Sequence, residues 1–452
     1  MLRYLPHTEE EIKEMLKTIG VDSIDELFQM IPERLRISSL DLGEPMDEYN
    51  LVDYFRNIGE NNISMNKLRV FRGAGIYNHF IPYVVYDLAS RTEFLTAYTP
   101  YQPEVSQGTL TFMFEFQTMI CELTGMEVAN SSMYDGASAM AEAILMAARL
   151  KNRFKVYVAE SIHPEYIQVV KTYCMGPGID LELVPFDETT GRIDLKGVDF
   201  TDREKPAALV VGYPNFFGVI EDLRAIRTAI PDDVLLIVVA NPLALALYRA
   251  PGDLGADIVV GDGQPLGIPP QFGGPSFGFF ATRMKYVRQM PGRIVGKARD
   301  FKGREGYVMI LQTREQHIRR HRATSNICTN HAHSALMATV YMSLMGRKGL
   351  KEVAKRCHDG AHYLVRELIS SLGGKLVFNA PFFHEFLIRL EMDTKYMDEK
   401  LREKGFLGPL PIADFYPRFG DDVALFCVTE LNTIDEMNEL VNILEAIKNG
   451  DI

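Results

Sequence analysis

Two short motifs carry residues that can bind phosphate or metal, but each departs from the pattern that the chemistry needs. The segment 292–297 (Gly-Arg-Ile-Val-Gly-Lys) is one residue short of a phosphate-binding P-loop, and Ala298 stands where the hydroxyl that holds magnesium should be. His384-Glu385 is followed by Ile388 at the place where a zinc-binding helix has its second histidine. These motifs therefore predict neither a nucleotide site nor a zinc site.

A pair of histidines, His317 and His321, has the four-residue spacing that places two side chains on one face of a helix. Such a pair can bind a metal, but the neighbouring cations would repel one: Arg314, Arg319, Arg320 and Arg322. We therefore expect packing or contact with an anion at this pair, and we predict no metal site in the chain.

Two loops have the composition of ligand-binding loops. The segment 130–138 precedes an alanine-rich run, so the N–H groups of a following helix could face an anion there. Simple capping of that helix by Asp135 or Ser132 is the favoured reading of these residues alone. The Gly- and Pro-rich tract 261–278 follows an apolar run at 258–260, and a binding loop is favoured there over a plain surface loop.

The segment 283–322 is strongly basic in an acidic protein. It holds twelve Lys and Arg against three acids, a net charge of +9, whereas the whole chain carries −12. Charge runs usually form solvated faces, but a long run of one sign favours contact with an acidic partner. No recognised nucleic-acid motif accompanies the run, so we predict no nucleic-acid partner.

An α/β domain with a mainly parallel sheet is expected to position these loops. Apolar, β-type runs begin near residues 155, 181, 207, 234, 258 and 277, and the intervals between them leave room for crossover helices. The run 234–240 is apolar without alternation, as in a strand covered on both faces. Parallel sheets bind ligands beyond the carboxyl ends of their strands, where the tract 261–278 begins.

Three regions are expected along the chain. Residues 1–70 form an N-terminal helical segment, with capping boxes beginning at Thr8 and Ser23, and packing on the main body is favoured over a separate binding module. Residues 71–325 form the large α/β domain. Residues 326–452 form a smaller α+β domain, with a long helical run, an antiparallel sheet from 375–378 and 383–390, and a final helix.

Composition predicts a globular protein of the cytoplasm. The chain has 452 residues, of which 47% are apolar and 24% charged, and this excludes a disordered chain. Its five cysteines are widely spaced and odd in number, which indicates a reducing compartment. We find no apolar run long enough to span a membrane, and the first residues lack a secretory signal.

The chain resembles one family over nearly its whole length: the alpha subunits (subunit 1) of the two-subunit glycine dehydrogenase (decarboxylating), the P-protein of the glycine cleavage system. Two of the matching segments are Phe-Arg-Gly-Ala-Gly-Ile-Tyr-Asn-His (71–79) and Ser-Met-Tyr-Asp-Gly-Ala-Ser (132–138). The remaining matches are 5–8 with 19–28, 98–108, 261–267, 311–320 and 323–329.

This resemblance implies a fold-type-I pyridoxal-phosphate-transferase-like large domain with a seven-stranded sheet, and a small C-terminal domain. It also implies glycine catabolism: glycine is decarboxylated, and the aminomethyl group passes to the lipoyl arm of the H-protein. Catalytic relatives need a lysine for the Schiff base and an acid beside the pyridine nitrogen.

Both groups are missing when the motifs are matched residue by residue. Gln264 falls at the lysine position, and no lysine occurs between Lys205 and Lys285. The strand that should carry the acid ends in Ala240-Asn241. The resemblance therefore implies a vestigial cofactor pocket, made of Tyr134, Asp135, Gly136, His163, Asn241 and Gln264.

We therefore expect the chain alone to be inactive, with no catalytic residue of its own and no covalently bound cofactor. The family pairs with glycine dehydrogenase subunit 2, which is expected to hold pyridoxal phosphate, in a heterotetramer. Edge residues of this chain could enter the partner's site, and the candidates are Tyr98, Tyr101, Arg314, Arg319 and Arg320. The alternative is a non-catalytic scaffold or regulatory subunit that docks the carrier protein or stabilises the partner.

Overall fold

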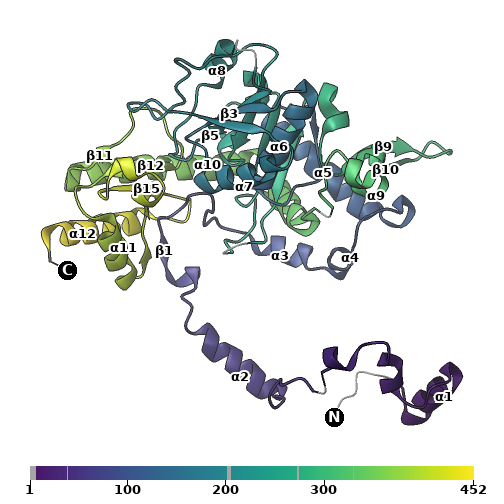
Figure 1. Cartoon of the computed structure of the whole chain (residues 1–452). Helices are drawn as coiled ribbons and strands as arrows, with labels where there is room; N and C mark the ends of the chain where they lie inside the picture. The colour runs from purple at the N-terminus through teal and green to yellow at the C-terminus, as the bar shows by residue number, and fades with distance from the viewer. Residues whose placement is uncertain (1–6, 38, 201–204, 272–273, 329, 452) are drawn as a thin grey trace. The chain divides into compact units, whose positions relative to one another are not determined.

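The computed structural model describes residues 7–37, 39–200, 205–271, 274–328 and 330–451. Its internal contacts divide the chain into two units, Met1–Ile63 and Ser64–Ile452. Figure 1 shows the elements of both units. No described helix has the length and apolar character needed to cross a bilayer.

The first unit consists of short helices with apolar faces. The capping box at Thr8 is confirmed, and Gly20 ends the first helix in the left-handed conformation. Ser23 caps a 3-10 helix rather than a second α-helix, since the stretch before Pro32 is too short for more than a turn or two. The elements are α1 (Glu9–Ile19), η1 (Ile24–Phe28), η2 (Glu33–Leu35) and α2 (Glu48–Gly59).

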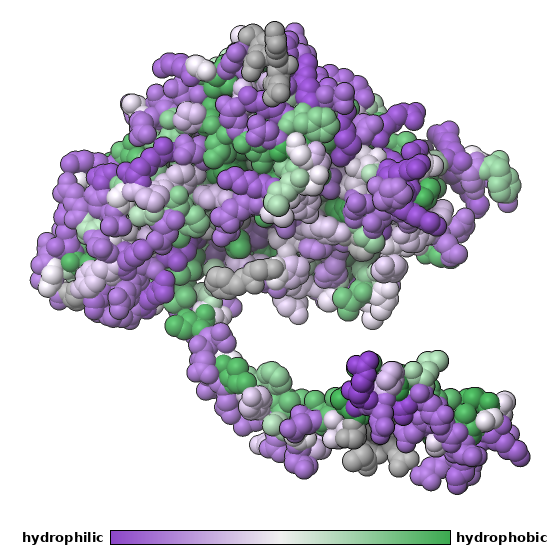
Figure 2. Space-filling view, viewed as in Figure 1, coloured by the Kyte–Doolittle hydropathy of each residue, from purple (hydrophilic) through white to green (hydrophobic). Residues whose placement is uncertain are grey.

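The apolar side chains of this unit stay exposed. No residue that the structure describes between 7 and 63 is buried, and apolar patches are visible over the unit in Figure 2. Phe28, Leu42 and Phe55 are among its exposed large side chains. The packing of this segment on the main body stays a prediction, as do the domain boundaries at 70 and 325.

A seven-stranded, mainly parallel sheet forms the centre of the second unit, as expected. The strand order is β2-β8-β7-β6-β5-β3-β4, and β3 to β7 run parallel while β8 is antiparallel to both of its neighbours. Each predicted strand start lies within one residue of the observed one. The strands are β2 (Val128–Ala129), β3 (Lys155–Ala159), β4 (Asp180–Val184), β5 (Ala208–Tyr213), β6 (Leu235–Ala240), β7 (Ile258–Asp262) and β8 (Gly278–Thr282).

Helices cover this sheet and enclose the largest hydrophobic core. The alanine-rich helix α6 packs against β7 and β8 because its small side chains allow a close approach. The helices before the small domain are α3 (Tyr83–Ala89), α4 (Thr92–Leu95), α5 (Gln107–Thr124), α6 (Gly136–Lys151), α7 (Pro164–Met175), α8 (Leu223–Ala229) and α9 (Gln316–Arg319). An antiparallel hairpin of β9 (Ile294–Arg299) and β10 (Glu305–Ile310) lies within the basic segment.

A second core belongs to a smaller antiparallel sheet near the C-terminus. Its strand order is β11-β12-β15-β14, so the predicted pairing of 375–378 with 383–390 is confirmed. The long helix α10 (Ala332–Leu372) contributes to both cores and is interrupted at Gly346. The other elements here are β1 (Arg69–Val70), β11 (Lys375–Leu376), β12 (Glu385–Arg389), α11 (Thr394–Glu403), β13 (Phe406–Leu407), β14 (Leu410–Pro411), β15 (Val423–Cys427) and α12 (Ile434–Asn449).

Candidate functional site

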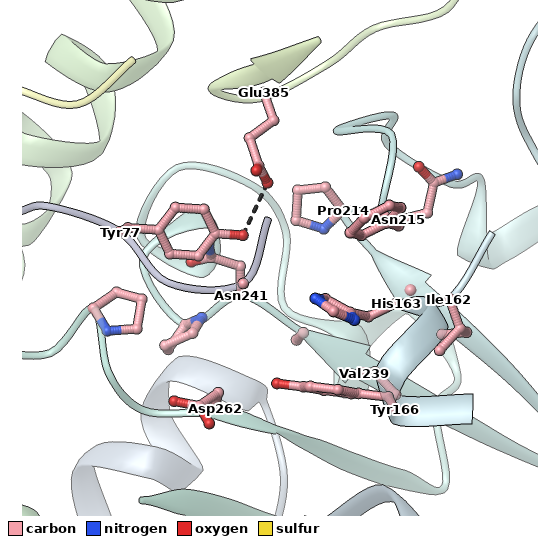
Figure 3. A pocket seen from close by; sticks show the side chains of 16 residues that line it. Tyr77, Ile162, His163, Tyr166, Pro214, Asn215, Val239, Asn241, Asp262 and Glu385 are labelled. Carbon is pink, nitrogen blue, oxygen red and sulfur yellow. Dashed lines mark hydrogen bonds between the residues drawn. The ribbon is translucent and has the colours of Figure 1, made fainter. Parts of the chain in front are cut away.

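A hollow of about 80 Å³ lies at the carboxyl ends of the parallel strands. His163 lies four residues after β3, Asn241 follows β6 and Asp262 ends β7, so the carboxyl ends of three strands bring side chains to one place. Tyr77 and Glu385 reach the hollow from the opposite side (Figure 3). Of the predicted pocket residues, His163 and Asn241 line this hollow, whereas Tyr134, Asp135 and Gln264 line a neighbouring cavity that His163 also borders.

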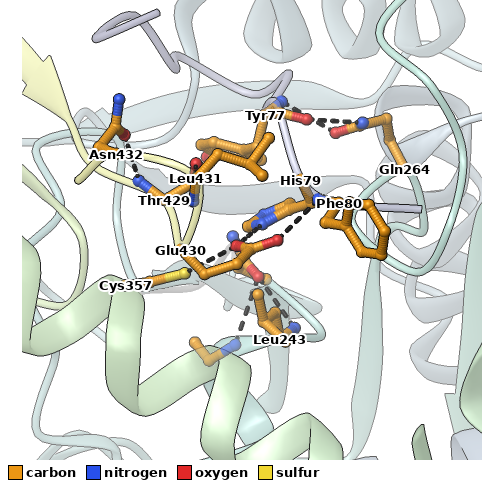
Figure 4. A network of polar contacts seen from close by, with 12 residues as sticks. Tyr77, His79, Phe80, Leu243, Gln264, Cys357, Thr429, Glu430, Leu431 and Asn432 are labelled. Atoms are coloured by element: carbon orange, nitrogen blue, oxygen red, sulfur yellow. Dashed lines mark hydrogen bonds and ion pairs between the residues drawn. The ribbon is translucent and has the colours of Figure 1, made fainter. Parts of the chain in front are cut away.

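Gln264 is fully engaged as a structural side chain. It is 3% exposed, and its amide nitrogen donates to the carbonyl oxygens of Tyr77 at 2.8 Å and Ile268 at 2.7 Å. Its amide oxygen accepts the N–H of Tyr77 at 2.9 Å (Figure 4). Both amide hydrogens and the oxygen thus tie the segment around Tyr77 to the tract after β7. A side-chain amide cannot form the imine that a cofactor-tethering lysine forms.

The N-terminus of α6 is satisfied by carboxylates of the chain itself. Asp135 accepts the N–H of Ser138 at 2.7 Å in a capping box, so the capping interpretation is confirmed. The first N–H of the helix, on Gly136, donates to Oδ2 of Asp262 at 3.0 Å. Oδ1 of Asp262 accepts from the Ser276 hydroxyl and from the N–H of Gln264. A phosphate at this helix end would therefore meet a carboxylate already in place.

His163 packs against protein side chains. Its Nε2 donates to the carbonyl of Ala74 at 2.9 Å, and its Nδ1 accepts the N–H of Glu165. Its ring stacks on Tyr166 with 5.0 Å between centroids and meets Phe216 edge-on at 4.8 Å. Burial lowers the pKa of His163, which favours the neutral ring.

Tyr134 and Asn241 also have structural partners. The Tyr134 hydroxyl accepts the N–H of Cys328 at 2.9 Å, and its ring lines a neighbouring cavity of about 320 Å³ together with Asp135. The Asn241 side chain accepts the N–H groups of Leu243 and Ala244. It therefore acts as a turn cap and supplies no acid for a pyridine nitrogen.

The residues present do not fit pyridoxal phosphate. The amine position is an amide with all its hydrogen bonds made, the acid position is a capping asparagine, and the helix end is filled by Asp262.

Glu385 and Asp262 are two residues of this site that the sequence did not reveal. Glu385 is buried, accepts the N–H of Ala74 at 2.6 Å and the Tyr77 hydroxyl at 2.8 Å, and burial raises its pKa to about 7. A carboxylate inside the apolar run 383–390 was the available signal, because a buried acid needs donors. For Asp262, the signal was its place shortly after the apolar run 258–260.

A second network ties the segment after Tyr77 to the C-terminal region (Figure 4). Glu430 accepts from the Nδ1 of His79 at 2.7 Å, from the N–H of Phe80 at 2.7 Å and from the thiol of Cys357 at 3.4 Å. The side chains of His79, Cys357 and Glu430 lie close enough together to hold a metal ion. Hydrogen bonding alone accounts for the cluster, since the His79 ring, the N–H of Phe80 and the Cys357 thiol all donate to the Glu430 carboxylate.

The candidate edge residues fall into two groups. Tyr98 is 75% exposed, and Tyr101 contacts the ring of His317 edge-on at 5.3 Å. Arg314, in contrast, is buried, and its two terminal nitrogens donate to the carbonyls of Met290 and Gly292. The two tyrosines therefore remain available to a partner, whereas Arg314 is held by a turn of its own chain.

The basic segment is not one continuous helix or one continuous charge surface. Helix α9 ends at Arg319 and Arg320 has a φ of 55°, so His317 and His321 do not share an unbroken helix face. Arg319 and Arg320 are exposed, and Arg319 donates to the carbonyl of Thr313. In the hairpin, Glu305 pairs with both Lys297 and Arg299.

Known proteins similar to this chain agree with the fold. The chain matches the family model for the glycine cleavage system P-protein over residues 2–444. It is 54% identical over 445 residues to a probable glycine dehydrogenase (decarboxylating) subunit 1 of Thermotoga maritima, covering 98% of this chain and 99% of that one. The corresponding Brevibacillus brevis protein is 47% identical over 447 residues, with 98% and 99% covered.

Solved structures also match the fold of this chain. A crystal structure of glycine decarboxylase (P-protein) of the glycine cleavage system, in inhibitor-bound form, matches with a TM-score of 0.90 and 43% identity over 99% of this chain and 100% of that one. A sphingosine-1-phosphate lyase of Burkholderia pseudomallei shares only the fold, with a TM-score of 0.66 and 16% identity over 92% of this chain and 94% of that one. The chain belongs to the glycine cleavage system P-protein family.

Proposed function

We propose that this chain is the alpha subunit of a two-subunit glycine decarboxylase and is active only with its partner. In the complex, glycine loses its carboxyl group as carbon dioxide, and the aminomethyl group passes to the lipoyl arm of the H-protein. One observation supports placing the cofactor on the partner subunit. At the position where an active chain needs a free amine, Gln264 has an amide whose nitrogen and oxygen are both hydrogen-bonded.

Pyridoxal phosphate belongs, in this proposal, to glycine dehydrogenase subunit 2. The names of the curated relatives, each a subunit 1, support the existence of such a partner. We infer a heterotetramer with two copies of each subunit, working in the cytoplasm. The β9–β10 hairpin pairs some of its cations with its own acids, but four cations against two acids leave it a net charge of +2, which would suit an acidic carrier protein.

Glycine–bicarbonate carboxyl exchange tests this proposal. The full chain with pyridoxal phosphate and lipoylated H-protein should show no exchange above the protein-free rate. Adding separately purified subunit 2 should produce exchange that saturates at a one-to-one ratio of subunits. Exchange by the chain alone would contradict the proposal, as would full exchange by subunit 2 without this chain.

Tyr98 and Tyr101 separate a contribution to the partner's site from a purely scaffolding role. If their hydroxyls contact the substrate or cofactor there, Tyr98→Phe or Tyr101→Phe should lower kcat of the complex by about tenfold, the effect of one lost hydrogen bond of about 1.4 kcal/mol. Tyr83→Phe is a matched control because Tyr83 is 80% exposed. Unchanged turnover in a normally assembled complex would favour the scaffold.

A further inference from the structure

A third cavity, of about 180 Å³, shares no lining residue with the hollow or with the cavity beside Tyr134. Helices α4 and α5 and the beginning of α10 form its walls, and Phe94, Phe112 and Leu336 make these walls largely apolar. The lining also includes residues with polar side chains: Tyr98, Thr99, Thr109, Arg293, Asn330 and His333. A mostly apolar cavity with a few convergent polar groups is the usual form of a small-molecule site.

Arg293 is a buried cation without adequate partners. It is 4% exposed, and among the described residues no hydrogen bond uses its guanidinium. The nearest carboxylate oxygen, on Glu315, lies 3.9 Å from its Nε, which is beyond hydrogen-bonding distance. The ring of Tyr101 lies 5.8 Å from the guanidinium carbon. A buried guanidinium with its N–H groups unused is costly unless something accepts from them.

Two more polar groups of the lining are also unsatisfied. The hydroxyl of Thr99 is buried and has no hydrogen-bond partner among the described residues. Asn330 donates its amide to Ser131 at 2.9 Å, and this leaves its buried amide oxygen without a partner. Nε of Arg293, the Thr99 hydroxyl and the Asn330 amide oxygen are thus buried without partners beside this cavity.

The chain holds Arg293 in place from both sides. Its own carbonyl accepts the N–H of Ser131 at 2.8 Å. The preceding Gly292 has a φ of +74°, and a Cβ there would lie 2.7 Å from the side-chain nitrogen of Asn130. Arg314 binds the carbonyls of this same turn. The guanidinium therefore enters the cavity from a fixed backbone, as a preorganised binding group would.

We infer that this cavity binds a small carboxylate, anchored by the guanidinium of Arg293. A carboxylate matches the planar fork of arginine with two parallel hydrogen bonds, and the Thr99 hydroxyl can donate a third. The unpaired oxygen of Asn330 suits an ammonium group, so glycine would use every orphaned group, whereas acetate would leave that oxygen free. The inference depends on the proposed function only for the choice of glycine as a probe.

Titration calorimetry on the full chain, without pyridoxal phosphate, tests the inference independently of decarboxylase activity. The probes are glycine, acetate and methylamine, at constant chloride. Glycine and acetate should bind saturably and methylamine should not. Arg293→Gln should weaken binding at least about tenfold, because a charge-assisted hydrogen bond is lost. The matched control is Arg299→Gln, since Arg299 ends the strand that follows Arg293 and its side chain is 71% exposed.

Each result has a definite meaning. Tighter binding of glycine than of acetate supports recognition of a zwitterion, and Asn330→Leu should then remove the difference. Equal binding of the two supports a general carboxylate site. Absence of saturable binding, or binding that Arg293→Gln leaves unchanged, overturns the inference. Binding that disappears when subunit 2 is added would assign the cavity to an acidic side chain of the partner, and would overturn it as well.

Discussion

Replacing Gln264 with lysine is expected to destabilise the chain without giving it a cofactor. A lysine at this position can donate but cannot accept, so the N–H of Tyr77 would lose its partner and an ammonium group would be buried. Together these changes should cost at least about 3 kcal/mol of unfolding free energy. Because Asp262 would still fill the end of α6, no bond to pyridoxal phosphate should form.

Urea unfolding and cofactor absorbance measure the two parts of this prediction. Gln271→Lys is the matched control, because Gln271 lies in the same tract but is exposed, and its replacement should change stability by less than about 0.5 kcal/mol. A stable Gln264→Lys chain that binds pyridoxal phosphate would show that the missing amine is the pocket's sole defect. The proposed role of Asp262 would then be wrong.

Replacing Glu385 with glutamine is expected to remove a large part of the pH dependence of stability. Burial raises the pKa of Glu385 to about 7, against 4.5 for the ordinary carboxyl group. Between these values the folded chain holds a proton that the unfolded chain has lost, so stability falls as pH rises. From pH 5 to pH 8 this amounts to roughly 2–3 kcal/mol at about 1.4 kcal/mol for each pH unit.

The test compares the unfolding free energies of the parent and the Glu385→Gln protein, measured from pH 5 to pH 8. The Glu385→Gln protein should gain stability relative to the parent as pH rises, with most of the gain complete by pH 8. Burial also raises the pKa of Glu221 to about 7, so the parent contains a second such group and only the difference isolates Glu385. Glu188→Gln, at an exposed position, should follow the parent. Parallel curves for all three proteins would contradict the assignment.

The sheet could be predicted because its signal is local. The run 234–240 is apolar without a break since both faces of β6 are covered, and that property is visible in seven consecutive residues. The absence of lysine between 205 and 285 is equally plain. Such features need no knowledge of which distant segments meet.

The contacts that close the pocket could not be predicted, because each joins residues far apart in the chain. Gly136 and Asp262 are separated by 126 positions, and Tyr77 and Glu385 by 308. The basic segment shows the same limit. A count of charges cannot reveal that Arg293 and Arg314 are buried, since their burial depends on a turn fixed by Ser131 and Gly292.

Borohydride reduction of the assembled complex, followed by peptide mapping, is the most direct test of the central claim that this chain offers no amine to the cofactor. Reduction makes the bond between lysine and pyridoxal phosphate permanent, so its position can be read from the peptides. We predict one pyridoxyl group on a lysine of subunit 2 and none on this chain. A stoichiometric adduct on any residue of this chain would contradict the account.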